Sequence, residues 1–148
     1  MNSLKETGEY TITEDMKKNL ADFEGGYAPE KNCFDKINSL YSNTGYVIDT
    51  HTSVAASVYD EYKKATGDDK VTVVASTASP YKFMKSVMTA IDSKYSDMDD
   101  FALIDELSKV SGTDVPKAVD DIRNAPVLHT DVCEKDEMKD MVKKFLGI

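Results

Sequence analysis

The chain has 148 residues, of which 41% are hydrophobic and 30% are charged. These proportions exclude a disordered tail and are typical of one compact domain of ordinary size. The formal net charge is −9, which argues against nucleic acid and anionic membrane surfaces as partners, because both are themselves negatively charged.

The lack of long apolar runs and the small number of cysteines indicate the cellular compartment of the protein. No apolar run approaches the roughly 18 residues of a membrane-spanning helix, and the first residues lack the apolar core of a secretory signal. The two cysteines, Cys33 and Cys133, lie far apart in the sequence, so we expect reduced thiols and a cytoplasmic protein without membrane association. The two cysteines and two histidines are too scattered for a zinc site, and no metal is expected.

The spacing of apolar residues predicts seven helices, and capping residues set their ends. Thr13, one of Asp49 and Thr50, and one of Asp99 and Asp100 are expected at helix starts, because their side chains accept hydrogen bonds from free backbone N–H groups. Cys33 is expected in the core. The predicted helices lie at about residues 13–25, 29–45, 49–67, 80–91, 99–112, 116–122 and 138–145.

One stretch is predicted to form a strand. Val71–Ser76 is uncharged and rich in β-branched residues, which is typical of a strand buried on both faces. Such a strand needs partners on both edges, yet only short extended pieces, among them residues 46–48 and 125–130, are available. We therefore expect an α/β fold with an incomplete sheet, in which residues 1–148 are the C-terminal fragment of a larger α/β catalytic domain. The exposed sheet edge is a possible site of self-association.

Hydroxyl groups follow the predicted strand. Ser76, Thr77 and Ser79 precede Pro80, which opens the next helix. In open α/β proteins, ligands bind at the carboxyl ends of strands, so these hydroxyls are candidates for a ligand site. The alternative is that Thr77 or Ser76 merely caps the helix from Pro80.

Two segments carry a family resemblance. Residues 45–55 read Gly-Tyr-Val-Ile-Asp-Thr-His-Thr-Ser-Val-Ala, and residues 76–83 read Ser-Thr-Ala-Ser-Pro-Tyr-Lys-Phe. They resemble two C-terminal motifs of threonine synthase, close to G-Y-x-I-D-P-H-T-A-V-A and S-T-A-H-P-A-K-F. That family is pyridoxal-phosphate dependent and has the tryptophan-synthase-β-like fold, known as fold type II. The resemblance extends from about Ser3 to the end of the chain but covers only the C-terminal part of the family.

The resemblance implies a cofactor site. Thr77 would meet the pyridine nitrogen of pyridoxal phosphate, where a neutral hydroxyl holds the ring without forcing its protonation. Ser76 and Asp49 are the other implied cofactor-binding residues. The catalytic cofactor lysine and the glycine-rich phosphate loop lie upstream in the family and are not found here, and Lys82 matches a motif lysine that is not the cofactor lysine.

Three further residues are implied to line the site. Thr50 and His51 belong to the loop that lies near the ring edge in the family, and Thr50 replaces the proline of the family. Ser79 replaces the usual histidine. The alternatives remain open that Asp49 is only a helix cap and that His51 is only a polar residue of the first helical turn.

The function implied by the resemblance is that of a carbon–oxygen lyase of threonine biosynthesis. It would convert O-phospho-L-homoserine and water to L-threonine and phosphate. The missing N-terminal part of the same chain would be its partner, and the isolated fragment would be inactive. Another fold-type-II pyridoxal-phosphate lyase and a non-catalytic helical interaction domain are the alternatives.

Overall fold

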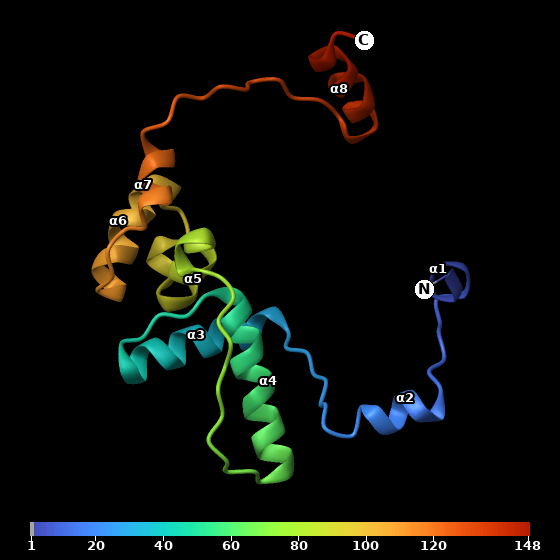
Figure 1. Cartoon of the computed structure of the whole chain (residues 1–148). Helices are drawn as coiled ribbons and strands as arrows, with labels where there is room; N and C mark the ends of the chain where they lie inside the picture. The colour runs from blue at the N-terminus through green and yellow to red at the C-terminus, as the bar shows by residue number, and fades with distance from the viewer. Residues whose placement is uncertain (1) are drawn as a thin grey trace. The chain divides into compact units, whose positions relative to one another are not determined.

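The computed structural model describes residues 2–148, and within them the chain is helical (Figure 1). It divides into two compact units, one ending at Thr113 and the other spanning Asp114–Ile148. The α-helices of the first unit are α1 (Asn2–Thr7), α2 (Glu14–Asn19), α3 (Glu30–Thr44), α4 (Thr50–Thr66), α5 (Met84–Ile91) and α6 (Asp100–Ser111), with short 3-10 turns η1 (Pro80–Lys82) and η2 (Ser93–Tyr95). The second unit contains α7 (Lys117–Arg123), η3 (Lys135–Glu137) and α8 (Met138–Leu146).

The core of the first unit lies between four helices. Helix α3 packs against α4 and α5, and α5 packs against α6. The apolar side chains that are almost completely buried come from α3, α5 and α6: Ile37, Val87, Met88, Leu103, Ile104 and Leu107. Cys33 is buried on α3 beside them, so its predicted place in the core is confirmed.

Local signals set several helix ends as predicted, but the helix expected from Pro80 starts with the 3-10 turn η1 and becomes the α-helix α5 only at Met84. Thr13, Asp49 and Asp99 are the caps of α2, α4 and α6, and the side chain of each accepts a backbone N–H of the following turn. Gly67 ends α4 with φ +70°, a left-handed conformation that glycine adopts without steric cost. Helix α2 is shorter than predicted, because its C-cap is already Leu20, and α1 was not predicted.

The predicted strand is wrong, and with it the α/β class. No residue in the described range 2–148 lies in a strand, neither Val71–Ser76 nor the extended pieces at 46–48 and 125–130. Val71 is 98% exposed and Val73 is 88% exposed, whereas burial on both faces was expected. The physical reason is that β-propensity depends on neighbours, and an extended run becomes a strand only when other strands satisfy its backbone. The sheet edge suggested for self-association is therefore absent from these residues.

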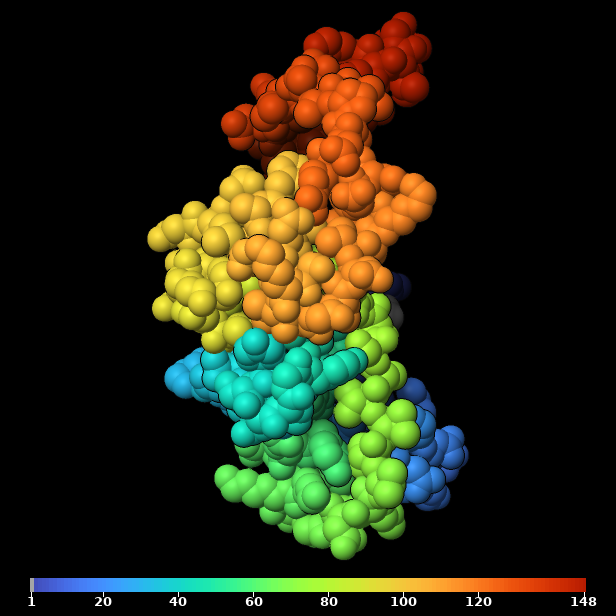
Figure 2. Space-filling view, turned by 90° about the vertical axis from the view of Figure 1, so that its left-hand side faces the viewer, coloured from blue at the N-terminus to red at the C-terminus, as the bar shows by residue number. Residues whose placement is uncertain are grey.

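The segment instead runs back along α4 (Figures 1 and 2). At one end, the Tyr62 hydroxyl of α4 donates a hydrogen bond to Asp68 at 3.2 Å. At the other end, the hydroxyls of Thr52 and Ser76 are 2.8 Å apart. These contacts fix both ends of the segment against one helix, and its second end brings the two sequence motifs together.

The second unit is held mainly by local interactions. Glu134 and Glu137 form a capping box around η3, and the Lys144 ammonium lies 3.0 Å from the Asp131 carboxylate. No residue of α7 or α8 is buried. Across residues 2–148, the helices are too short or too polar for any of them to span a membrane.

Candidate functional site

The start of α4 organises the candidate site around a buried carboxylate. Asp49 is 1% exposed and follows Val47 and Ile48, which are also buried and anchor the loop. Its Oδ1 atom accepts hydrogen bonds from the backbone N–H groups of His51 at 2.8 Å and Thr52 at 3.3 Å. This is the bonding pattern of an aspartate N-cap, so the predicted capping role of Asp49 is confirmed.

The second oxygen of Asp49 connects the two motifs. Oδ2 accepts a hydrogen bond from the Thr52 hydroxyl and another from the Ser76 hydroxyl at 3.4 Å. The hydroxyls of Thr52 and Ser76 are themselves 2.8 Å apart. We call Asp49, Thr52 and Ser76 the Asp49 cluster; it joins residues that lie 27 positions apart in the sequence.

The Asp49 cluster keeps its carboxylate ionised. Burial acts to raise the pKa of Asp49 and is the largest single effect. The hydrogen bonds from the Thr52 hydroxyl and from the backbone N–H groups of His51 and Thr52 oppose it, and together they bring the pKa below its usual value. A fixed negative charge therefore lies beneath the surface at the first turn of α4.

The side chain of His51 lies next to the Asp49 carboxylate. Its Nδ1 atom is 3.4 Å from Oδ1 of Asp49 and 3.4 Å from the Thr50 hydroxyl. The imidazole ring packs against Phe83, with ring centroids 4.8 Å apart and planes tilted by 45°. The His51 side chain remains 59% exposed, so it is oriented by its neighbours without being enclosed by them.

Two grooves meet at His51. One, of about 400 Å³, is lined by Cys33, Phe34, Thr50, Val54 and other residues of the first unit. The other, of about 730 Å³, runs along α4 past Val58 and Tyr62. His51 lines both grooves, and it is therefore a polar group that a ligand in either groove would reach.

The hydroxyls of the second motif have separate roles. Ser76 belongs to the Asp49 cluster, whereas Ser79 accepts a hydrogen bond from the backbone N–H of Tyr81 at 3.3 Å and caps η1. Thr77 lies between them, is exposed, and makes no hydrogen bond to any residue in the described part of the chain. Capping of the Pro80 turn therefore belongs to Ser79, and the Thr77 hydroxyl is left available.

Lys82 and Phe83 complete the second motif. Lys82 is exposed, with its ammonium 5.5 Å from the centroid of the Phe83 ring. Tyr81 is buried, and its hydroxyl donates to the carbonyl oxygen of Thr113 at 3.0 Å. The buried tyrosine fixes the turn that places Phe83 against His51.

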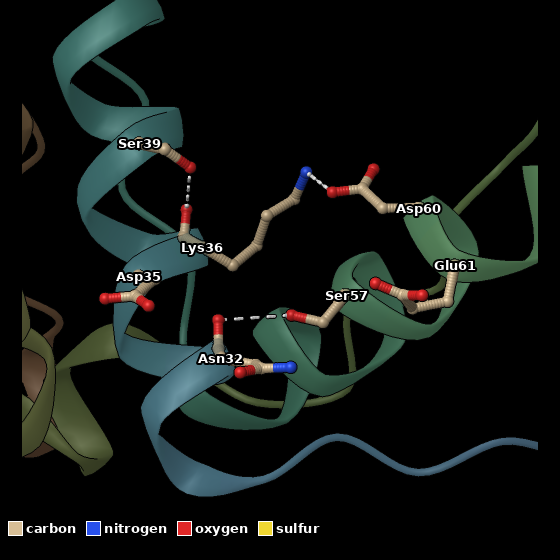
Figure 3. Close-up of a pocket in the computed structure, with 7 residues that line it drawn as sticks. All are labelled: Asn32, Asp35, Lys36, Ser39, Ser57, Asp60 and Glu61. Atoms are coloured by element: carbon tan, nitrogen blue, oxygen red, sulfur yellow. Dashed lines mark hydrogen bonds and ion pairs between the residues drawn. The ribbon is translucent and has the colours of Figure 1, made fainter. Parts of the chain in front are cut away.

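A separate polar pocket lies between α3 and α4 (Figure 3). There Lys36 of α3 reaches across to the Asp60 carboxylate of α4, and the Ser57 hydroxyl donates to the carbonyl oxygen of Asn32 at 3.4 Å. Asp60 lies nine positions, or two and a half turns, after His51 and so faces the other side of α4. This pocket joins two helices and is distinct from the site built by the two motifs.

Four residues predicted from the sequence lie together in the structure: Asp49, Thr50, His51 and Ser76. Two residues of the site were not predicted: Thr52, which links Asp49 to Ser76, and Phe83, which packs against His51. Thr52 had a usable signal, because it is the third residue after a capping aspartate, where a side chain returns to the cap. Within residues 2–148, no group of three histidine, cysteine or acidic side chains is arranged to hold a metal ion.

Comparison with known proteins identifies the family. Residues 52–141 match the family model described as "Threonine synthase, C-terminal", which covers more than half of the chain. The chain therefore belongs to the threonine synthase family, as its two motifs indicate, and it corresponds to the C-terminal part of that family.

Curated relatives agree with this assignment. The threonine synthase of Schizosaccharomyces pombe is 33% identical over 99 residues, which are 66% of this chain and 19% of the relative. "Threonine synthase-like 1" of Macaca fascicularis is 35% identical over 79 residues, and that of Homo sapiens is 34% identical over 79 residues; each match covers 53% of this chain and 10% of the relative. The chain thus spans between a tenth and a fifth of the length of these relatives.

Proposed function

We propose that this chain forms the C-terminal part of a pyridoxal-phosphate-dependent threonine synthase, which converts O-phospho-L-homoserine and water to L-threonine and phosphate. The observation that carries the proposal is the Asp49 cluster, because it joins the two family motifs through side-chain hydrogen bonds. Asp49 and Thr52 of the first motif thereby contact Ser76 of the second motif, and Ser76 is followed directly by Thr77, whose hydroxyl has no partner among residues 2–148.

The residues present fit the ring of the cofactor. When bound, pyridoxal phosphate supplies an electron sink for removal of a proton from an amino-acid substrate. Thr77 offers a neutral, exposed hydroxyl without a partner among residues 2–148, as a pyridine nitrogen requires. The neighbouring Ser76 is held by the Asp49 cluster, so the Thr77 backbone is fixed on one side.

In this proposal, Asp49 does not contact the cofactor but orients the residues that surround it. Both of its oxygens are occupied by hydrogen bonds from protein groups, and it is almost fully buried. It therefore orients Ser76 and His51 and contributes a fixed charge near the ring. Thr50 and His51 line the grooves, while Ser79 uses its hydroxyl to cap η1 and leaves the role of the family's histidine unfilled.

The remaining parts of the active site are proposed to lie in the N-terminal part of the same protein. These parts are the cofactor lysine and the phosphate-binding loop, and the isolated chain is accordingly inactive. We further propose that the protein is cytoplasmic, which is consistent with the free thiols of Cys33 and Cys133.

The proposal is tested in a chimeric enzyme in which this chain replaces the matched region of the S. pombe threonine synthase. Thr77→Val is nearly isosteric and leaves a ring nitrogen unpaired, which costs roughly 1–3 kcal/mol. Phosphate release should fall by about ten- to a hundredfold, with a changed cofactor absorption spectrum. Thr77→Ser keeps the hydroxyl and should be mild.

Two results contradict the proposal. Full activity with an unchanged spectrum in Thr77→Val would remove Thr77 from the cofactor site. Turnover of O-phospho-L-homoserine by the isolated chain with pyridoxal phosphate, together with a lysine modified after borohydride reduction, would show that the chain needs no other part.

A further inference from the structure

We propose that Tyr81 is a positioning residue for Thr77: its buried hydroxyl, bonded to Thr113, fixes the turn that presents the Thr77 hydroxyl to the pyridine nitrogen of the cofactor. The inference rests on the proposed function and deepens it. Its basis is the juxtaposition of the second motif with the end of α6, since Tyr81 contacts a residue 32 positions further along the chain. The family motif has alanine at the position of Tyr81, so the resemblance does not supply this contact.

Tyr81 joins η1 to the end of α6 through its hydroxyl. The side chain is 5% exposed, and the hydroxyl donates a hydrogen bond to the carbonyl oxygen of Thr113 at 3.0 Å. The Thr113 hydroxyl lies 3.2 Å from the same phenol oxygen. Because a buried phenol can leave these partners only by becoming an unsatisfied polar group, Tyr81 is confined to one position.

The residue that accepts this hydrogen bond is itself held in place. The Ser108 hydroxyl of α6 donates to the Thr113 carbonyl oxygen at 2.7 Å, and the hydroxyls of Ser111 and Thr113 are 2.7 Å apart. Helix α6 belongs to the core of the first unit, where Leu107 is completely buried. The Tyr81 hydroxyl therefore ties the turn of the second motif to the core.

Thr77 lies between two fixed points of the chain. On its N-terminal side, Ser76 belongs to the Asp49 cluster. On its C-terminal side, Ser79 accepts a hydrogen bond from the backbone N–H of Tyr81 at 3.3 Å, and only one residue separates Thr77 from Ser79. The two attachments together restrict the directions that the exposed Thr77 hydroxyl can take, and displacing a contact in an active site by about 1 Å can cost about a hundredfold in rate.

The first test needs neither cofactor nor substrate. Tyr81→Phe removes only the hydroxyl, and the Thr113 carbonyl oxygen keeps the hydrogen bond from Ser108, so the melting temperature should fall by only a few degrees. In the 148-residue chain, ¹⁵N relaxation measures the order parameter of the Thr77 backbone amide. We expect it to fall from about 0.85, typical of rigid backbone, toward the values below about 0.6 of flexible backbone.

Tyr62→Phe is the matched control for this measurement. The Tyr62 hydroxyl bonds Asp68 at the other end of the same returning segment, and the Asp49 cluster lies between that end and Thr77 in the sequence. The order parameter of Thr77 should therefore be unchanged in Tyr62→Phe. An unchanged order parameter in Tyr81→Phe, or an equal fall in both variants, overturns the proposal.

The second test uses the chimeric enzyme. Tyr81→Phe should lower kcat by about tenfold and change the cofactor absorption spectrum in the same direction as Thr77→Val does. Because Tyr81 acts through Thr77, adding Tyr81→Phe to Thr77→Val should lower kcat no further. A second tenfold fall in the double variant would show that Tyr81 acts independently of Thr77 and overturns its positioning role.

Failure of this inference is distinguishable from failure of the proposed function. A Thr77 amide that loosens in Tyr81→Phe, together with full activity in Thr77→Val, would contradict the cofactor contact while the attachment of the turn by Tyr81 stands. A Thr77 amide that stays rigid in Tyr81→Phe, together with low activity in Thr77→Val, would overturn the positioning role of Tyr81 and leave the cofactor contact standing.

Discussion

Helices α3 to α6 and helices α2 and α8 follow the same local rules but differ in burial. Each group contains ends set by local signals, such as the Thr13 and Asp99 N-caps and the left-handed glycines Gly45 and Gly147, yet the first group encloses side chains such as Leu107 at 0% exposure, whereas α2 and α8 bury no residue. On α2, Met16 is 52% exposed, and on α8, Phe145 is 59% exposed. Capping and periodicity thus determine where helices form, while burial depends on partner surfaces, and the candidate site begins on a helix of the buried group.

The difference in burial predicts that a core leucine contributes far more to the free energy of unfolding than an exposed one. Leu107→Ala leaves a cavity in the core and should lower the free energy of unfolding by about 2–5 kcal/mol. The matched change Leu20→Ala, at a position 49% exposed beside α2, should alter it by less than about 0.5 kcal/mol. Urea denaturation measures both variants, and equal losses would show that the region around α2 is as well packed as α6.

A second comparison concerns two aspartate caps. Asp49→Ala removes the N-cap of α4 and leaves buried donors unsatisfied, so the free energy of unfolding should fall by about 2–3 kcal/mol. Asp99→Ala removes the N-cap of α6, where the residue is exposed and accepts only from the backbone N–H groups of Phe101 and Ala102. Its expected loss is about 1 kcal/mol. Thermal unfolding measures the stability of both variants. A smaller loss of stability in Asp49→Ala than in Asp99→Ala would contradict the role given to the Asp49 cluster.

The pH dependence of stability provides a third prediction. Hydrogen bonds hold the pKa of Asp49 below its usual 3.8 in the folded chain. Its contribution to stability is therefore fully present above the unfolded value and is lost as the pH falls through the lower folded value. Free energies of unfolding measured from about pH 5 downward should decline less steeply in Asp49→Asn than in the wild-type chain. Parallel curves would mean that Asp49 titrates alike in both states.

Local residues made most of the helices predictable. Thr13, Asp49 and Asp99 cap helices because their short polar side chains reach free N–H groups a few residues away, and this depends on little else in the chain. Whether Val71–Ser76 forms a strand could not be predicted in the same way, and the predicted strand is absent. Its formation depends on pairing with distant residues, and no segment between residues 2 and 148 provides that pairing.

The site was predictable only in part. The family resemblance suggested Asp49 and Ser76 separately, but the hydroxyl of Thr52 that links them is a contact between a helix and a returning segment. The packing of Phe83 on His51 likewise depends on how η1 turns against the start of α4. Such contacts follow from tertiary structure, and neither spacing nor composition specifies them.

Thr52 joins the two motifs into one site, and a double-mutant cycle tests this role of Thr52 most directly. Thr52→Val and Ser76→Ala, alone and combined, are compared by the free energy of unfolding, with Thr52→Val and Ser79→Ala as the control pair. We expect a coupling energy of about 1 kcal/mol between Thr52 and Ser76, because they belong to one hydrogen-bond network, and a coupling energy near zero for the control pair. Additive effects of Thr52→Val and Ser76→Ala would contradict it.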